Sequence, residues 1–260
     1  MSGPFKVLSC AFAIVAIAIL AASCGSGNAQ YRVVNAIPNT TTFDPNGFAI
    51  YMNGTGLWTD VEFPATEPSS SGKYQSVSGG TDTIQVYPTS EAGQTGAVAV
   101  ISSALNLGGG TQYTVVLAGN STASGATYPL AAQLITDNNP TPTSGDAGIR
   151  VIDASISLSE QGSVDVLSLP TGDTCCAGAT TIGSGLQYPQ NTGTGNINTG
   201  YQNVGIPTNG SVTLWVTAHN NTADQIYHNS LTVTAGQNYT VVLVDSVGGA
   251  SPPQFVDLEP

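Results

Sequence analysis

The chain has 260 residues, of which 16 are Asp or Glu and only 4 are Lys or Arg, so its formal net charge is -12 at pH 7. A chain this acidic has no cluster of cations to neutralise phosphates, which excludes nucleic acid as a partner. Charged residues make up 8 % of the chain and hydrophobic residues 40 %, so the chain can bury cores and is not a disordered polar tail.

The first element is an export signal. One cation, Lys6, precedes an unbroken apolar run over 11–22, and small residues follow it as far as Cys24. This run is too short for a stable membrane span and has the three-part order of a secretory signal. We therefore expect residues 1–23 to be a signal peptide and the mature chain to leave the cytoplasm.

Two cleavage points fit these residues. The stretch LAASC ending at Cys24 resembles a bacterial lipobox, although the usual Leu three places before the cysteine is Ala21 here. The alternative is an ordinary signal-peptidase cut after Ala29, which the small residues Gly27 and Ala29 would permit. We expect lipidation of Cys24, a flexible tether over 24–30 and attachment to the membrane through the lipid.

The rest of the chain contains the same sequence pattern twice. YRVVNA at 31–36 returns as IRVIDA at 149–154, and QYTVVLAG at 112–119 returns as NYTVVLVD at 238–245. Repeated landmarks in the same order predict two units of one fold, over 31–136 and 148–260. The Pro- and Thr-rich stretch 137–147 between them predicts a semi-rigid linker, with the units joined like separate beads.

Short runs rich in Val, Thr, Ile and Tyr, separated by Gly, Pro, Asn and Ser, predict strands throughout both units. They lie near 31–36, 47–53, 73–78, 82–88, 97–106, 112–119 and 130–136, and then near 148–154, 162–169, 200–205, 210–218, 226–233, 238–245 and 253–258. Helical spacing is absent outside the signal. The pattern predicts an all-β protein of two tandem immunoglobulin-like antiparallel β-sandwich domains.

A corner motif precedes each copy of the YTVVL strand. Gly110 and Tyr113 have the same spacing as Gly236 and Tyr239, each after an apolar residue that closes the strand before. Glycine permits the sharp corner, and the tyrosine hydroxyl can turn back onto the corner backbone. We interpret all four residues as structural.

Together these residues suggest a family. The order R-V-[VI]-[ND]-A, a strand such as FAIYMNG or SVDVLSL, and then G-x-x-Y-T-V-V-L resembles the tandem modules of the bacterial domain of unknown function 4397. The resemblance covers nearly all of the mature chain and implies an exported, often lipidated protein with immunoglobulin-like repeats. Family members often have His-Ala-Ser-Pro after the first strand, but here the steps are NAIP at 35–38 and DASI at 153–156. The resemblance therefore implies no shared ligand there.

Two adjacent cysteines, Cys175 and Cys176, lie in a segment of the second unit that has no equivalent in the first. In an oxidising compartment they can form a vicinal disulfide, pair with other chains or remain free thiols. An intermolecular pair would give a covalent dimer. A vicinal ring would stiffen the loop and offer a flat apolar contact to a ligand.

The long segment Pro170–Thr199 is the candidate binding loop. With Tyr188 in it and Tyr201 just beyond, it combines aromatic rings with hydroxyl and amide groups, which suits stacking on the sugar rings of a glycan. Two histidines, His219 and His228, flank a turn near Asp224. They lack a third well-placed ligand, so we predict no metal site.

No Gly-x-Ser-x-Gly elbow, His-Glu-x-x-His motif or phosphate-binding glycine loop occurs in the sequence. We therefore expect a protein that is not an enzyme and needs no cofactor. The prediction is a cell-envelope lipoprotein with a structural, adhesive or ligand-binding role, with a polysaccharide or an envelope protein as partner. The alternative is a secreted pair of accessory domains that assists an enzyme or an export system.

Overall fold

A computed structural model of the chain describes residues 27–38, 46–69, 74–120, 122, 126–189, 200–246 and 253–258. Cys24 and residues 190–199 of the candidate loop lie outside these ranges. The described chain is almost entirely β, with one short α-helix, α2 (Ile156–Gln161), and one 3-10 turn, η1 (Thr89–Glu91). No helix within these ranges is both long and apolar enough to cross a membrane.

The first half of the chain forms two sheets. The first outer sheet has the order β3-β2-β6-β7, and the first central sheet has the order β4-β1-β8-β9, with β5 also paired to β1. The strands are β1 (Asn28–Asn35), β2 (Phe48–Met52), β3 (Thr55–Val61), β4 (Ala65–Glu67), β5 (Gln75–Ser78), β6 (Gly80–Pro88), β7 (Ile101–Leu107), β8 (Gln112–Ala118) and β9 (Ala131–Thr136).

The second half repeats this plan. The second central sheet has the order β13-β10-β16-β17, and the second outer sheet has the order β12-β11-β14-β15. The strands are β10 (Asp146–Asp153), β11 (Val164–Pro170), β12 (Thr180–Leu186), β13 (Gln202–Gly205), β14 (Ser211–Ala218), β15 (Asn221–Thr232), β16 (Asn238–Val244) and β17 (Gln254–Leu258).

One parallel pair lies in each central sheet, where all the other pairs are antiparallel. β1 runs parallel to β8 with Tyr31 opposite Tyr113, and β10 runs parallel to β16 with Ile149 opposite Tyr239. In each unit, the strand that contains the first repeated sequence (YRVV or IRVI) therefore lies beside the strand that contains the second (YTVV). The sequence repeat thus corresponds to one parallel strand pair in each unit.

Each half has its own hydrophobic core between its outer and central sheets. Alternate residues of each strand point into it, such as Val33, Ile84 and Val115 in the first unit and Val151, Leu214 and Val241 in the second. Burial of these side chains drives the pairing of the sheets.

The corner tyrosines bond back to the backbone that precedes them. The Tyr113 hydroxyl accepts a hydrogen bond of 2.8 Å from the Gly108 amide, and the Tyr239 hydroxyl accepts one of 2.9 Å from the Thr234 amide. Gly110 and Gly236 have φ values of 75° and 77°, which favour glycine. The two corners are built alike.

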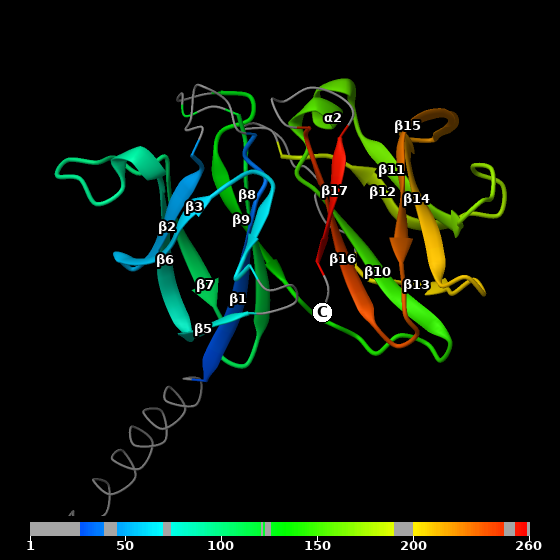
Figure 1. Cartoon of the computed structure of the whole chain (residues 1–260), viewed down its shortest axis with the longest axis horizontal. Coiled ribbons are helices and arrows are strands. Elements are labelled where there is room, and N and C mark those ends of the chain that lie inside the picture. Colours follow the sequence, from blue (N-terminus) through cyan, green and yellow to red (C-terminus); the bar gives the residue numbers. More distant parts are fainter. Residues whose placement is uncertain are drawn as a thin grey trace, which may run out of the picture.

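The two units also pack against each other, contrary to the expectation of separate beads. A third apolar cluster lies between the two central sheets and includes Val34 and Val116 from one unit and Ile152 and Val242 from the other. Figure 1 shows the four sheets side by side, with the two central sheets facing each other. The inner strands of these sheets, β1, β8, β10 and β16, are therefore buried on both faces.

The described strands differ from the sequence prediction at several places. β3, β4 and β12 were not predicted, and residues 28–30, expected in the tether, form the start of β1. In the segment predicted to be a linker, Asp137 is buried and the Pro140 carbonyl accepts a hydrogen bond of 2.7 Å from Asn238. This segment lies against the second unit and is not a free spacer.

Candidate functional site

The main polar feature of the interior is a pair of arginines between the central sheets. Arg32 in β1 and Arg150 in β10 occupy equivalent positions of the repeat, and each is only 2 % exposed. Arg32 Nε donates to Thr114 Oγ1 at 3.0 Å, and Arg150 Nε donates to Thr240 Oγ1 at 2.8 Å. Each threonine is the register partner of its arginine on the adjacent parallel strand.

One carboxylate holds both guanidinium groups. The Asp137 side chain is fully buried; it forms an ion pair with Arg150 and lies 3.7 Å from Arg32 Nη2. Its Oδ2 also accepts a hydrogen bond of 2.7 Å from Thr114 Oγ1. Buried charges are tolerated when they are paired and hydrogen-bonded, as they are here. We call Arg32, Arg150, Asp137, Thr114 and Thr240 the arginine cluster.

Two tyrosine rings cover the arginine cluster. The guanidinium carbons of Arg32 and Arg150 each lie 4.9 Å from a ring centroid, that of Tyr74 and that of Tyr201 respectively. The Tyr74 hydroxyl donates to Asp137 Oδ2 at 2.7 Å. Burial, with the charge of Asp137 adding to it, raises the pKa of Tyr74 well above its usual value. Tyr74 is therefore a neutral donor at physiological pH.

The arginine cluster joins the two units. Arg32 Nη2 of the first unit lies 3.5 Å from Thr240 Oγ1 of the second, and Asp137 reaches both arginines. Arginine keeps its proton at any physiological pH. The arrangement can orient the two units and stabilise the interface between them.

A polar cleft of about 580 Å³ lies beside the arginine cluster and is lined by Gln30, Gln112 and Asn139 among others. The amides in its wall are bonded to one another, with Gln112 donating to Gln30 at 2.9 Å and Asn139 donating to Gln112 at 3.1 Å. These bonds continue the polar contacts between the units.

Tyr188 and Tyr201 do not form an exposed binding surface, contrary to the sequence prediction. Tyr188 is 1 % exposed, and its hydroxyl donates to the Ala118 carbonyl of the first unit at 3.2 Å. Burial raises its pKa to about 12. The Tyr201 hydroxyl lies 2.9 Å from Thr240 Oγ1 and donates to Asn139 at 2.8 Å. Both tyrosines belong to the interface between the units.

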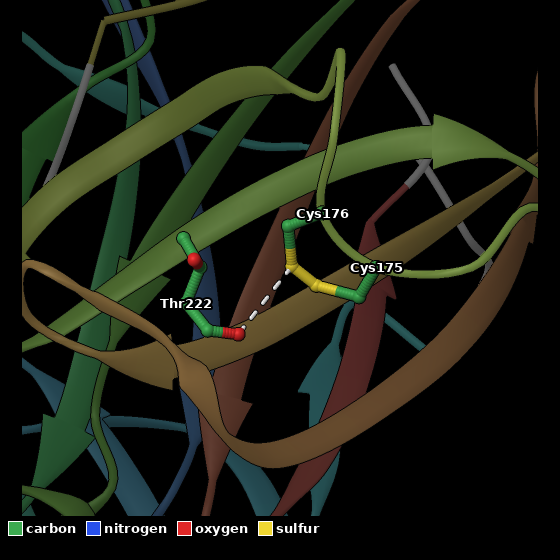
Figure 2. The surroundings of a disulfide bond; sticks show 3 residues. All are labelled: Cys175, Cys176 and Thr222. Carbon is green, nitrogen blue, oxygen red and sulfur yellow. Dashed lines mark hydrogen bonds between the residues drawn. A yellow bond between two sulfur atoms is a disulfide. The ribbon is translucent and has the colours of Figure 1, made fainter.

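The adjacent cysteines lie in the loop between β11 and β12. The structure joins Cys175 and Cys176 in a vicinal disulfide, and Figure 2 shows the Cys176 sulfur facing the Thr222 carbonyl, 4.0 Å away. Both cysteines are partly exposed, and the loop residues on either side are exposed. The disulfide thus closes a ring near the end of the second outer sheet.

The two histidines have separate partners. His219 Nδ1 lies 2.7 Å from Asp165 Oδ1, and the His228 ring stacks on Trp215 with centroids 4.1 Å apart. Asp224 joins neither contact. Within the described ranges, no three His, Cys, Asp or Glu side chains gather as a metal site would require.

Sequence reasoning missed the arginine cluster, although its signal was present. Each of the two copies of the repeat retains an arginine at the same place, in a chain with only 4 basic residues. The YTVVL runs are apolar without alternation, which is typical of strands buried on both faces. A cation in a strand beside such a run indicates a buried ion pair.

Comparison with known proteins gives a family but no named function. No curated protein matches the chain. A family described as "Domain of unknown function (DUF4397)" matches residues 29–167, which run from β1 through the first unit into β11. Over more than half of its length, therefore, the chain carries the pattern of that family, and it belongs to the DUF4397 domain family.

Proposed function

We propose that this protein is a non-catalytic lipoprotein of the bacterial cell envelope, in which two immunoglobulin-like sandwiches act as one rigid surface module with a structural, adhesive or ligand-binding role. The observation that carries the proposal is the closed interface between the central sheets. It combines an apolar cluster with the arginine cluster, so the two units have a fixed relation. A rigid pair suits a protein that presents a surface at a set distance from a membrane.

The start of β1 supports anchoring at Cys24. Ala29 is fully buried and pairs with Val77, and the Gly79 amide donates to the Gly27 carbonyl at 3.0 Å. A cut after Ala29 would remove these contacts from the strand. A cut before Cys24 keeps the whole strand and leaves only residues 25 and 26 between the lipidated cysteine and Gly27, the first residue bonded to the fold.

The hydrogen bonds of Asp165, the carboxylate beside His219, support a role without catalysis. Asp165, the partner of His219, also accepts hydrogen bonds from Ser184, Gly185 and Asn220. Partial burial raises its pKa, but these bonds and the one from His219 outweigh burial and hold the pKa below its usual value. A carboxylate bonded in this way fixes a loop and does not accept a proton readily.

The test is the intact mass and location of the protein made in its native cells, compared with a Cys24→Ala variant. We expect the wild-type protein in the membrane fraction, with the mass of residues 24–260 plus a diacylglyceryl group. The variant should lose the lipid and the membrane association. A lipid-free chain that starts at Gln30 in the medium would instead support the secreted accessory pair.

A further inference from the structure

The outer face of the first outer sheet carries an aromatic surface far from the interface. Ile50, Ile84 and Val86 point into the core, so their neighbours Tyr51, Gln85 and Tyr87 point outward. Tyr51 is opposite Gln85 in the register of β2 and β6. The three side chains therefore share one face.

Contacts around Tyr51 and Tyr87 hold the two rings in place. Their centroids are 5.3 Å apart at an interplanar angle of 75°, an edge-to-face contact. Gln85 Nε2 donates to the Tyr87 hydroxyl at 3.2 Å. The Tyr51 ring also lies over Gly56 of β3, where an added Cβ would be 3.2 Å from Cε1. Glycine at this position gives the ring its room.

The loop between β6 and β7 completes a pocket over these rings. The pocket has a volume of about 230 Å³, and its lining consists of Tyr51, Gly54, Gln85, Tyr87, Gly93, Gln94, Gly96 and Ala97. The neighbouring Val98 is 73 % exposed, the one large hydrophobic residue that is exposed among the described residues. The pocket thus has an aromatic floor, two amide side chains and an apolar rim.

The chemistry of this lining selects a ligand class. No lining residue is charged, so the pocket offers no counter-ion to an ionic ligand. Tyrosine presents a flat apolar ring and a polar hydroxyl, and glutamine offers a donor and an acceptor. This combination matches a sugar ring, which has apolar C–H faces and a rim of hydroxyl groups. We infer that the pocket binds a neutral sugar unit of a polysaccharide, seated on Tyr51 and Tyr87.

The second unit provides a natural comparison. At the positions equivalent to Tyr51, Gln85 and Tyr87 it has Leu167, Trp215 and Thr217, as the matching strand registers show. In place of the long loop it has a tight turn at 219–220 between β14 and β15. Among the described residues, the lining of this pocket is therefore not repeated in the second unit. The sugar site deepens the proposed function and rests on it, because it names the ligand class of the surface module.

The test is affinity electrophoresis of the purified mature protein in gels that contain one soluble polysaccharide each. The neutral probes are dextran, laminarin, galactomannan and xyloglucan, and alginate serves as the anionic comparison. We expect at least one neutral polymer to retard the protein and alginate not to. Tyr51→Ala and Tyr87→Ala should each weaken binding about tenfold, as truncation of a central aromatic anchor does.

Two further variants keep the outcome decisive. His228→Ala removes an exposed ring from the second outer sheet and should bind like the wild type. Gln94→Ala changes an exposed loop residue of the pocket without altering the sheet, so weaker binding at an unchanged melting temperature would place the ligand there. If no neutral polymer retards the wild-type protein, or if the three pocket variants bind as well as it does, the assignment is wrong. The lipid test described above would still decide the envelope location by itself.

Discussion

Asn35 and Asp153 occupy the same place in the two copies of the repeat but differ in charge. The Asn35 amide donates to the Val61 and Glu62 carbonyls at 2.9 and 3.1 Å. Asp153 Oδ1 accepts from the Ser155 amide at 2.9 Å, whereas its buried Oδ2 has no hydrogen-bond partner in the described structure. Burial, with the charge of Asp245 adding to it, raises the Asp153 pKa from 3.8 to about 7.

This raised pKa gives a prediction for Asp153→Asn. Between pH 4 and 7 the folded protein holds a proton on Asp153 that the unfolded chain has lost, so the free energy of unfolding falls as pH rises. The variant should remove this fall and be the more stable protein at pH 8, by at most about 4 kcal/mol. At pH 3, where both states are protonated, this advantage should vanish.

Urea unfolding of both proteins from pH 3 to 8 would measure the effect. Asp173→Asn, in an exposed loop, is the matched control and should leave the pH dependence unchanged. An equal decline of stability with pH in the wild type and in Asp153→Asn would contradict the prediction.

At the scale of elements, the two tyrosine corners offer a matched pair. Tyr113→Phe and Tyr239→Phe each remove the hydroxyl that accepts a backbone hydrogen bond and leave the ring in place. We expect each to lower the free energy of unfolding by about 1 kcal/mol, and by similar amounts, because the corners are alike. Thermal unfolding would measure both, with Tyr51→Phe on the outer face as control. If both variants unfolded at the same temperature as the wild-type protein, the hydroxyl hydrogen bonds would contribute nothing to stability.

Strands with a dense run of β-branched and aromatic residues could be predicted from the sequence, and strands without such a run could not. The runs of β8 and β16 are dense in Val and Tyr, and glycine marks their corners, so their positions could be predicted. β3, β4 and β12 are short or rich in Thr and Gly and have little apolar periodicity. Their pairing depends on the neighbouring strands, which no local pattern shows.

The central interface was harder to predict than the strands. A lone arginine in a strand does not identify its partner, and Asp137 lies more than a hundred residues from Arg32 in the chain. The polar sequence around Tyr188 and Tyr201 predicts an exposed loop. The Tyr188 hydroxyl instead bonds to the first unit, and the Tyr201 ring lies over Arg150, contacts that only the tertiary structure shows.

At the scale of the whole molecule, the shared interface should make the two units unfold together. Ile152 is fully buried in the apolar cluster between the central sheets. Ile152→Asp would place an unpaired charge there, which costs several kcal/mol. We expect the single thermal transition of the wild-type protein to become two transitions in this variant, followed by circular dichroism or calorimetry.

The matched control is Val98→Asp. Val98 is exposed in the loop between β6 and β7 and does not belong to the apolar cluster between the units. This variant should keep the single transition. Two transitions in the wild-type protein itself would mean that the interface is too weak to couple the units.

The first strand also determines which end of the first unit a lipid on Cys24 would adjoin. Asn28 begins β1 next to Ser78, where β6 is about to start, and β6 then runs nine residues to Pro88 at the loop of the aromatic pocket. At about 3.3 Å per residue this separates the two ends by roughly 25 Å, and Figure 1 shows the start of β1 and this loop at opposite ends of the first unit. A lipid on Cys24 would thus hold the base of the sandwich close to the bilayer. The tyrosine floor would lie on the outer face of the first outer sheet, near the end of β6 that is farther from the lipid.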